Sequence, residues 1–215
     1  MKRVLLSILI LAFIVIAFPM LHPGFPFTHD GENHLARIAN YAVAFKQGQF
    51  PPRWAPTFWG GYGYPVFNFN YPLANILAVP FLALGLHVET TLKLLFLFGV
   101  GLGVFGTYAY CRIFMPKTAS LLAACTYVLS PFLFTNIYLR GAIGEVFGYA
   151  LLPITLWMIE RTRQRPSRKN KLFLFISILS LSLAHNIVAM FVIPPLLIYI
   201  VLRVRTWHVI LPSLF

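Results

Sequence analysis

Charged residues are scarce in this sequence, and acidic residues are the scarcest. Of the 215 residues 10% are charged, with five Asp or Glu against 17 Lys or Arg. A soluble domain has about 25% charged residues. Hydrophobic residues make up 59% of the chain, and the mean hydropathy is +0.79. These values exclude a soluble globular protein and predict an integral membrane protein.

Cysteine is also rare. The two cysteines, Cys111 and Cys125, lie in or beside apolar segments. Two such thiols provide neither a disulfide framework nor a Cys-x-x-Cys metal site. We expect each to be a small packing residue.

The formal net charge of +12 raises the question of a nucleic-acid partner. Most basic residues, however, stand in short runs between apolar segments, with no basic face and no recognisable nucleic-acid-binding module. Such runs are typical of cytoplasmic loops under the positive-inside rule. We therefore expect the lipid bilayer as a partner and no nucleic acid.

The N-terminus resembles a signal peptide, because Lys2 and Arg3 precede an apolar run from Val4 to Phe18. The run is long for a signal peptide, and the residues after it offer no small-x-small cleavage site. We predict an uncleaved first transmembrane helix over residues 1–21, with the N-terminus in the cytoplasm. We expect the protein to lie in the plasma membrane.

A long polar and aromatic loop follows over residues 22–72. Part of it has a helical period, with an apolar stripe made of Leu35, Ile38, Ala42 and Phe45. The opposite side carries polar side chains, namely Asn33, Arg37, Asn40 and Gln47. This pattern predicts a helix that lies in the membrane interface with its apolar side down.

The same loop then becomes rich in Gly, Pro and aromatic residues between Arg53 and Pro65. Aromatic rings concentrate at the headgroup level of membranes. We expect most of these rings to anchor the protein there, while one or two line a sugar-binding pocket.

Residues 73–215 hold the remaining transmembrane helices of a single all-α transmembrane domain. The apolar segments after the first helix are Tyr71–Leu86, Leu92–Tyr110, Thr118–Phe134, Val146–Ile159, Leu172–Ala184 and Ile187–Leu202, and another begins near Val209. A membrane-spanning helix needs about 20 residues. We therefore expect several of these segments to extend into their flanks.

The positions of the basic residues indicate which loops are cytoplasmic and which are extracytoplasmic. If every segment crossed, the basic run at 161–171 would lie outside, against the positive-inside rule. Tyr71–Leu86 is short and contains Pro80, so we expect it to re-enter or lie flat. Twelve of the 17 basic residues are then cytoplasmic: Lys2, Arg3, Arg112, Lys117, Arg161, Arg163, Arg165, Arg168, Lys169, Lys171, Arg203 and Arg205. Four of the five acids are extracytoplasmic: Asp30, Glu32, Glu89 and Glu145.

Two of those acids, Asp30 and Glu32, directly follow the first helix. Asp is a favoured N-cap residue, and a negative charge suits the positive end of a helix. Capping alone and a catalytic carboxylate are both open interpretations of Asp30, and capping does not exclude catalysis.

Three polar groups gather on the predicted outer side. They are His29–His34, the loop that holds Arg140 and Glu145, and the pair His185 and Asn186. Ionisable groups at membrane depth are costly and usually mark function. We therefore expect the three groups to form one site.

Each group has a second interpretation. The glycines beside Arg140 would let backbone N–H groups approach an anion, and the guanidinium would bind phosphate in a bidentate manner. Alternatively, Arg140 pairs with Glu145 or with a lipid headgroup. His185 would bind either a phosphate or a helix end. Asp30 and His34 are four residues apart on a helix, so a divalent metal is an open option, although no spacing requires one.

These residues resemble the GT-C superfamily of polytopic glycosyltransferases, which take sugars from polyprenyl-phosphate carriers. The likeness rests on the first helix, the long outer loop that opens with Asp30-x-Glu32, and the Gly/Pro/aromatic run. More narrowly, the motifs His29–His34, Trp59–Pro65 and Arg140-Gly141-Ala142 with Glu145 are similar to a group of prokaryotic membrane proteins labelled "6-pyruvoyl-tetrahydropterin synthase-related". Nothing in the sequence supports the pterin chemistry of that label. GT-C proteins are usually longer, so we expect this chain to be an N-terminal portion.

The resemblance implies an inverting sugar transfer outside the cytoplasm. Asp30 would be the general base, and Glu32 would orient the acceptor or hold a metal. The remaining candidate residues would bind substrate: His34, Arg37, Arg53, Arg140, Glu145, His185 and Asn186. The competing hypotheses are a transporter or flippase of lipid-linked saccharides and a non-catalytic membrane protein. Transporters place ionisable residues near the membrane midplane, often in repeated halves, whereas here the acids lie at segment ends.

Overall fold

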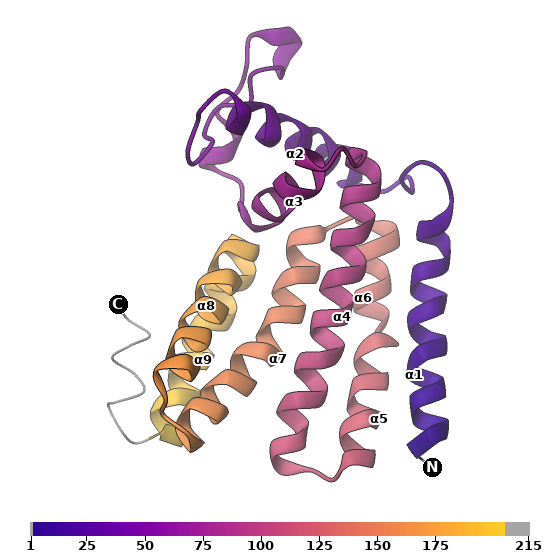
Figure 1. The fold of residues 1–215 in the computed structure, drawn as a ribbon, viewed down its shortest axis with the longest axis vertical. Helices are drawn as coiled ribbons and strands as arrows, with labels where there is room; N and C mark the ends of the chain where they lie inside the picture. The colour runs from indigo at the N-terminus through magenta and orange to yellow at the C-terminus, as the bar shows by residue number, and fades with distance from the viewer. Residues whose placement is uncertain (1, 205–215) are drawn as a thin grey trace.

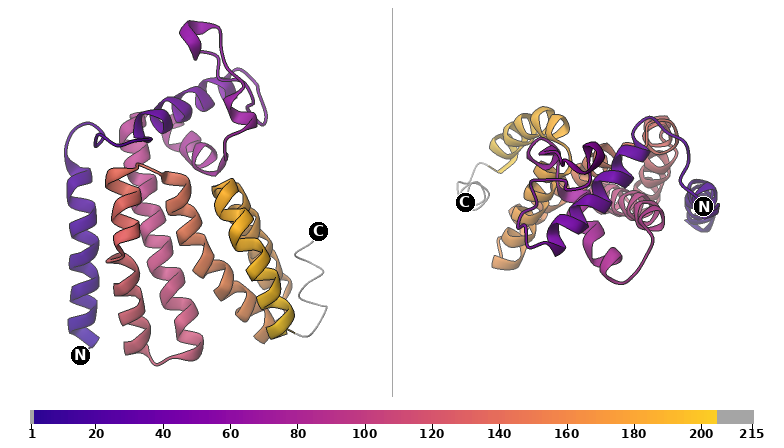
Figure 2. Two further views of the ribbon diagram at one scale, coloured as in Figure 1. Left: turned by 180° about the vertical axis from the view of Figure 1, so that it is seen from behind. Right: turned by 90° about the horizontal axis from the view of Figure 1, so that it is seen from above.

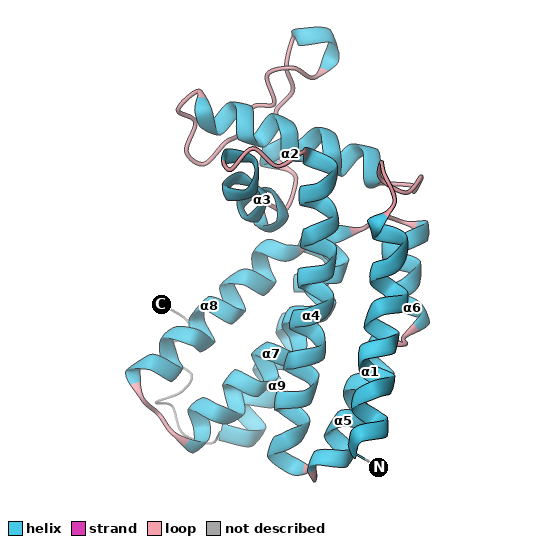
Figure 3. Ribbon diagram, turned by 45° about the vertical axis from the view of Figure 1, so that its right-hand side comes forward, coloured by secondary structure: helices cyan, strands magenta, loops and turns pink. Residues whose placement is uncertain are grey.

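The fold is a bundle of long helices with a smaller helical layer across one end. The computed structural model describes residues 2–204, and within them it has helices and one isolated β-bridge but no strand (Figures 1 and 3). The α-helices are α1 (Lys2–Ala17), α2 (Gly31–Lys46), α3 (Leu73–Ala83), α4 (Val88–Phe114), α5 (Lys117–Val128), α6 (Pro131–Phe134), α7 (Ile143–Gln164), α8 (Arg168–Ala184) and α9 (Asn186–Val204). The segment predicted near Val209 lies outside the described residues.

Five helical stretches are long and apolar enough to cross a membrane, which confirms the prediction of an all-α fold with several such helices. They are Arg3–Leu21, Val88–Phe114, Lys117–Leu139, Ile143–Gln164 and Asn186–Arg203. Most are longer than the apolar runs in the sequence, as expected from the thickness of a bilayer. The third stretch is interrupted at Pro131 and ends in a π-helix, Thr135–Leu139.

The segment expected to re-enter or lie flat is α3, and it does not cross the bundle. Its 11 residues span about 17 Å at 1.5 Å per residue, against about 30 Å for a hydrocarbon core. It lies beside α2 at one end of the molecule, whereas α4 and α7 run along the long axis (Figures 1 and 2). The sequence prediction for this segment therefore agrees with the structure.

The two ends of the bundle differ in charge. Both loops at the end opposite α2 are basic: Arg112 and Lys117 flank the turn between α4 and α5, and the run 161–171 joins α7 to α8 (Figure 1). Asp30 and Glu145 lie at the other end, at the starts of α2 and α7. The predicted separation of the acids from the basic run is thus present in the fold.

Small residues let α4 pack closely against α7. A Cβ atom on Gly106 would lie 2.6 Å from the side chain of Ile154 and 2.9 Å from its backbone nitrogen, so the two backbones almost touch. Nearer the α2 end, Phe96 and Phe147 are completely buried between the same helices. Close packing over small residues is how helices associate in lipid. Here it fixes the position of the first turn of α7 relative to α2.

The helix predicted for the first loop is α2, but its polar side is partly covered. Ile38 is buried as expected (1% exposed), whereas Phe45 is 42% exposed. Asn40 is expected on the polar, solvent-facing side of the helix, but it is buried. Its side-chain oxygen accepts hydrogen bonds from the backbone N–H and the hydroxyl of Thr57, at 3.0 and 2.9 Å. The prediction of a helix with one solvent-facing polar side is therefore wrong at Asn40, because the following loop folds back over it.

The aromatic run forms a hairpin that projects from α2 away from the bundle (Figures 1 and 2). Ala55 and Tyr64 pair through two backbone hydrogen bonds of 2.8 and 3.0 Å. Near its tip Trp59 and Tyr62 are 74% and 90% exposed. The hairpin lies beyond α2 and does not run alongside the spanning helices (Figure 1). That its rings anchor the protein at the headgroup level stays a prediction.

Candidate functional site

Two loops that are far apart in sequence are joined by backbone hydrogen bonds at the α2 end. The N–H of His29 donates to the carbonyl of Leu139 at 3.1 Å, and the N–H of Asp30 donates to the carbonyl of Arg140 at 2.8 Å. The sequence prediction that these two polar groups meet is therefore confirmed at the level of the backbone. The contact positions the start of α2 directly over the loop between the π-helix and α7.

Gly141 is required by this contact. Its φ is +67°, and a Cβ atom there would lie 2.4 Å from the hydroxyl oxygen of Thr28 and 2.9 Å from the backbone nitrogen of Gly31. From the sequence alone, we expect this glycine to open backbone N–H groups toward an anion. In the structure it admits the turn that carries Asp30.

Asp30 occupies the N-cap position of α2, yet its side chain makes no capping hydrogen bond. The hydroxyl of Thr28 instead accepts the hydrogen bond from the N–H of Gly31, at 3.1 Å. Only the backbone carbonyl of Asp30 bonds to the helix, by accepting from the N–H of His34 at 3.0 Å. Capping by the carboxylate therefore does not explain why an acid stands at this position.

Arg140 is held by side chains of its own loop. Its Nη1 donates to the carboxylate of Glu145 at 2.5 Å and to the carboxamide oxygen of Asn136 at 3.0 Å. The hydrogen bond with Glu145 is the main reason that the pKa of Arg140 is raised. The pairing with Glu145, one of the two interpretations of the sequence, is thus present. The Arg140 side chain is 38% exposed, and among the described residues its side-chain hydrogen bonds all use Nη1.

His34, Tyr71 and His185 form a row of rings beneath α2. The ring of Tyr71 lies 6.1 Å from that of His34 and 4.5 Å from that of His185, measured between centroids. His34 is 3% exposed, and burial, assisted by the charge of Arg37, lowers its pKa to about 4. Burial also lowers the pKa of His185. Both imidazoles are therefore neutral near pH 7.

His185 has a structural role as well. Its Nδ1 accepts a hydrogen bond from the N–H of Val188 at 3.3 Å, in the first turn of α9. The helix-end interpretation of this histidine is thus confirmed. Because Nδ1 is the acceptor, the proton of the neutral ring is on Nε2, which is a donor.

Tyr71 is the residue that sequence reasoning missed. Burial raises the pKa of its phenol, and the charges of Arg37, Asp30, Glu145 and Arg140 all act on it. These four charged side chains therefore lie close enough to Tyr71 to act electrostatically on its phenol. Tyr71 stood at the edge of an aromatic stretch, and no local signal separated it from the other tyrosines of the chain. Only the tertiary structure brings it between the two histidines.

Three candidates do not join this cluster. Glu32 and Asn186 are exposed. Arg53 lies in the segment before the hairpin, where its guanidinium donates to the side chain of Asn68 at 3.2 Å. The cluster that the structure supports consists of Asp30, His34, Arg37, Tyr71, Arg140, Glu145 and His185, and we call it the Asp30 cluster. Among the described residues no group of three or more His, Cys, Asp or Glu side chains is close enough to hold a metal ion.

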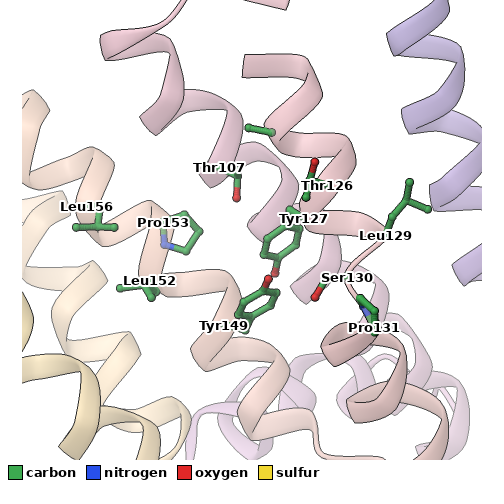
Figure 4. A pocket seen from close by; sticks show the side chains of 11 residues that line it. Thr107, Thr126, Tyr127, Leu129, Ser130, Pro131, Tyr149, Leu152, Pro153 and Leu156 are labelled. Atoms are coloured by element: carbon green, nitrogen blue, oxygen red, sulfur yellow. The ribbon is translucent and has the colours of Figure 1, made fainter. Parts of the chain in front are cut away.

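Cavities in the described part of the protein lie in the bundle, away from the Asp30 cluster. One of about 640 Å³ is bordered by α4, α5 and α7, and no member of the cluster lines it. Figure 4 shows its lining, in which the rings of Tyr127 and Tyr149 stack 4.7 Å apart. The buried hydroxyl of Tyr127 has no hydrogen-bond partner among the described residues.

No family model matches this sequence, and no curated protein or solved structure matches it either. The residues and geometry of the Asp30 cluster are therefore the basis for assigning a function.

Proposed function

We propose that this protein is a membrane glycosyltransferase of the GT-C type. It would transfer a sugar from a polyprenyl-phosphate carrier to an acceptor hydroxyl on the extracytoplasmic side of the plasma membrane. The observation that carries this proposal is the position of Asp30, whose carboxylate caps no helix although its backbone is tied to the Arg140 loop. An acid with no structural task, beside two arginines and neutral imidazoles, is suited to acid–base chemistry.

The neutral state of His34 matters for such a base. A charged imidazolium four residues along the helix would be a partner for an ion pair with Asp30. Because the pKa of His34 is lowered to about 4, its ring carries no charge near pH 7. The Asp30 carboxylate is therefore not paired with a charged imidazole.

In the proposed reaction Asp30 removes the proton from the acceptor hydroxyl as the hydroxyl oxygen forms a bond to the anomeric carbon. The bond from that carbon to the phosphate oxygen breaks, and its electron pair leaves with the lipid phosphate. Attack opposite the leaving group inverts the anomeric configuration. Nη2 and Nε of Arg140 face no recorded partner among the described residues, and with Arg37 they would stabilise the charge on the departing phosphate.

Two features favour an enzyme over a transporter of lipid-linked saccharides. The charged side chains at the start of α7 and near its end, Glu145 and Glu160, are separated by a stretch with no charged residue. The long helix α4 shows the same pattern between Lys93 and Arg112. Transporters commonly place ionisable groups at the midplane. Here the ionisable groups collect at the ends of the helices.

The test is sugar transfer in membranes from a labelled polyprenyl-phosphate donor. Asp30→Asn keeps the size of the side chain and removes the base, so transfer should fall by the 10²–10⁴-fold typical of general acid–base catalysis. Glu89→Gln is the matched control, because Glu89 is an exposed acid in the first turn of α4 and lies outside the Asp30 cluster. Undiminished transfer by Asp30→Asn would remove Asp30 as the base. Transfer from a soluble nucleotide sugar alone would contradict the donor assignment.

A further inference from the structure

An apolar groove opens near the basic end of the bundle, far from the Asp30 cluster. It has a volume of about 450 Å³ and is bordered by α4, α7 and α8. Its lining is mainly aliphatic and aromatic: Leu102, Leu151, Ile154, Trp157, Met158, Phe173 and Ile176, with Ser177 and Ser180. The hydroxyl of Ser177 donates to the carbonyl of Leu174 at 2.8 Å, so it offers the groove little polarity. The volume lies in the range of small-molecule and lipid pockets.

Cationic side chains stand at the mouth of this groove. The guanidinium of Arg161 lies over the ring of Trp157, 5.2 Å from its centroid, and the ammonium of Lys169 lies 5.9 Å from that of Phe173. A neighbouring pocket of about 220 Å³ shares Trp157 and Arg161 with the groove and adds Arg165. The two aromatic rings therefore hold two cationic groups at the mouth of the apolar groove.

The protein itself does not neutralise these cations. The only acid of the sequence near this end is Glu160, which is completely buried. Its Oε2 accepts from Arg163 at 2.8 Å, and its Oε1 accepts from Tyr199 at 2.6 Å and from Arg203 at 3.2 Å. Both carboxylate oxygens are thus occupied. Among the described residues Arg161, Arg165 and Lys169 have no ion pair.

We propose that this groove binds an anionic glycerophospholipid. One acyl chain lies along the apolar lining between α7 and α8, and the phosphate is bound by Arg161 and Lys169, with Arg165 beside them. The charge complementarity is that of basic pockets between membrane helices that take acidic lipid headgroups. This site is independent of the function proposed for the Asp30 cluster.

The proposal is tested by native mass spectrometry of the purified full chain in detergent, with added phosphatidylglycerol or phosphatidylcholine. The wild type should retain phosphatidylglycerol at least tenfold more strongly than it retains phosphatidylcholine. The double variant Arg161→Gln/Lys169→Gln should weaken that binding at least tenfold, because each cation near an anionic lipid contributes several-fold. The matched control is Arg168→Gln/Lys171→Gln, which removes two positive charges from the same basic run, 161–171, and neither residue lines either pocket. It should stay within about twofold of the wild type.

A second variant tests the groove rather than the charge. Ser180→Phe fills the apolar lining and leaves Arg161 and Lys169 in place, so it should weaken phosphatidylglycerol binding but not the binding of inorganic phosphate. Equal losses in the two double variants would show general attraction to the basic loop and overturn the site. Unchanged lipid binding by Ser180→Phe, or a dimer of this chain that forms without lipid and is lost in Ser180→Phe, would overturn the lipid as the occupant.

Discussion

The backbone N–H of Asp30 donates to the backbone carbonyl of Arg140 at 2.8 Å. This one bond links the acid proposed as the base to the arginine proposed for the phosphate without using the side chain of either residue. Because the bond is between backbones, it fixes the distance between the two loops whatever their side chains do. The geometry of the Asp30 cluster therefore depends on how closely those loops approach each other.

The first prediction concerns that approach. Gly141→Ala should destabilise the protein by about 1–2 kcal/mol for the left-handed backbone and by a further 1–3 kcal/mol for crowding, since its Cβ would lie 2.4 Å from Thr28. The control is Gly85→Ala, where φ is +86° but a Cβ would meet nothing within 4 Å. Thermal unfolding in detergent measures both. Equal losses in the two variants would show that the loop contact is not tight.

The second prediction concerns pH. The pKa of His34 is lowered from 6.5 to about 4 in the folded state, so between these values the unfolded chain binds a proton that the folded protein does not. Stability should therefore fall as the pH drops from 6.5 toward 4, by up to about 3 kcal/mol from this residue. Unfolding measured at pH 7.5 and pH 5 should show the loss.

The matched variants for this pH dependence are His34→Gln and His29→Gln. The first removes the buried imidazole and should make the dependence shallower, with the remainder coming from His185, whose pKa is also lowered. The second removes an exposed histidine from the same segment and should leave the pH dependence of stability as in the wild type. A wild-type slope retained by His34→Gln would assign the proton uptake to another group.

The third prediction concerns Tyr71, whose hydroxyl makes no hydrogen bond among the described residues. Tyr71→Phe keeps the ring between His34 and His185, so the free energy of unfolding should change by less than about 1 kcal/mol, as expected for a phenol without a bonding partner. If the phenol helps to bind the sugar or the phosphate, transfer should fall about tenfold through a higher KM for the donor. Unchanged transfer would limit Tyr71 to packing.

The fourth prediction concerns the sides of the membrane. Single cysteines placed in a background without Cys111 and Cys125 should react with an impermeant thiol reagent from outside at position 29, and not at position 165. Both His29 and Arg165 are exposed in the structure, so burial does not limit either reaction. Labelling at 165 alone in intact cells would reverse the predicted orientation.

The sequence by itself determined that the protein is helical and lies in a membrane, because low charge and long apolar runs leave few other folds for the chain. It also predicted that Tyr71–Leu86 does not cross, since one proline and one short run are enough to argue against a span. The predicted meeting of Asp30 with Arg140 came from counting crossings, a global constraint that needs no side-chain detail. These predictions agree with the structure because composition and length act over whole segments.

What only the tertiary structure decided is which side chains share the Asp30 cluster. Tyr71 enters it and Glu32 does not, although Glu32 is two residues from Asp30. The reason is that a helix turns by about 100° per residue, so Asp30 and His34 point toward the bundle while Glu32 points away. The burial of Asn40 beneath Thr57 and the projection of the aromatic hairpin beyond α2 depend on the path of a long loop, and its contacts are set by partners distant in sequence. No local pattern encodes those partners.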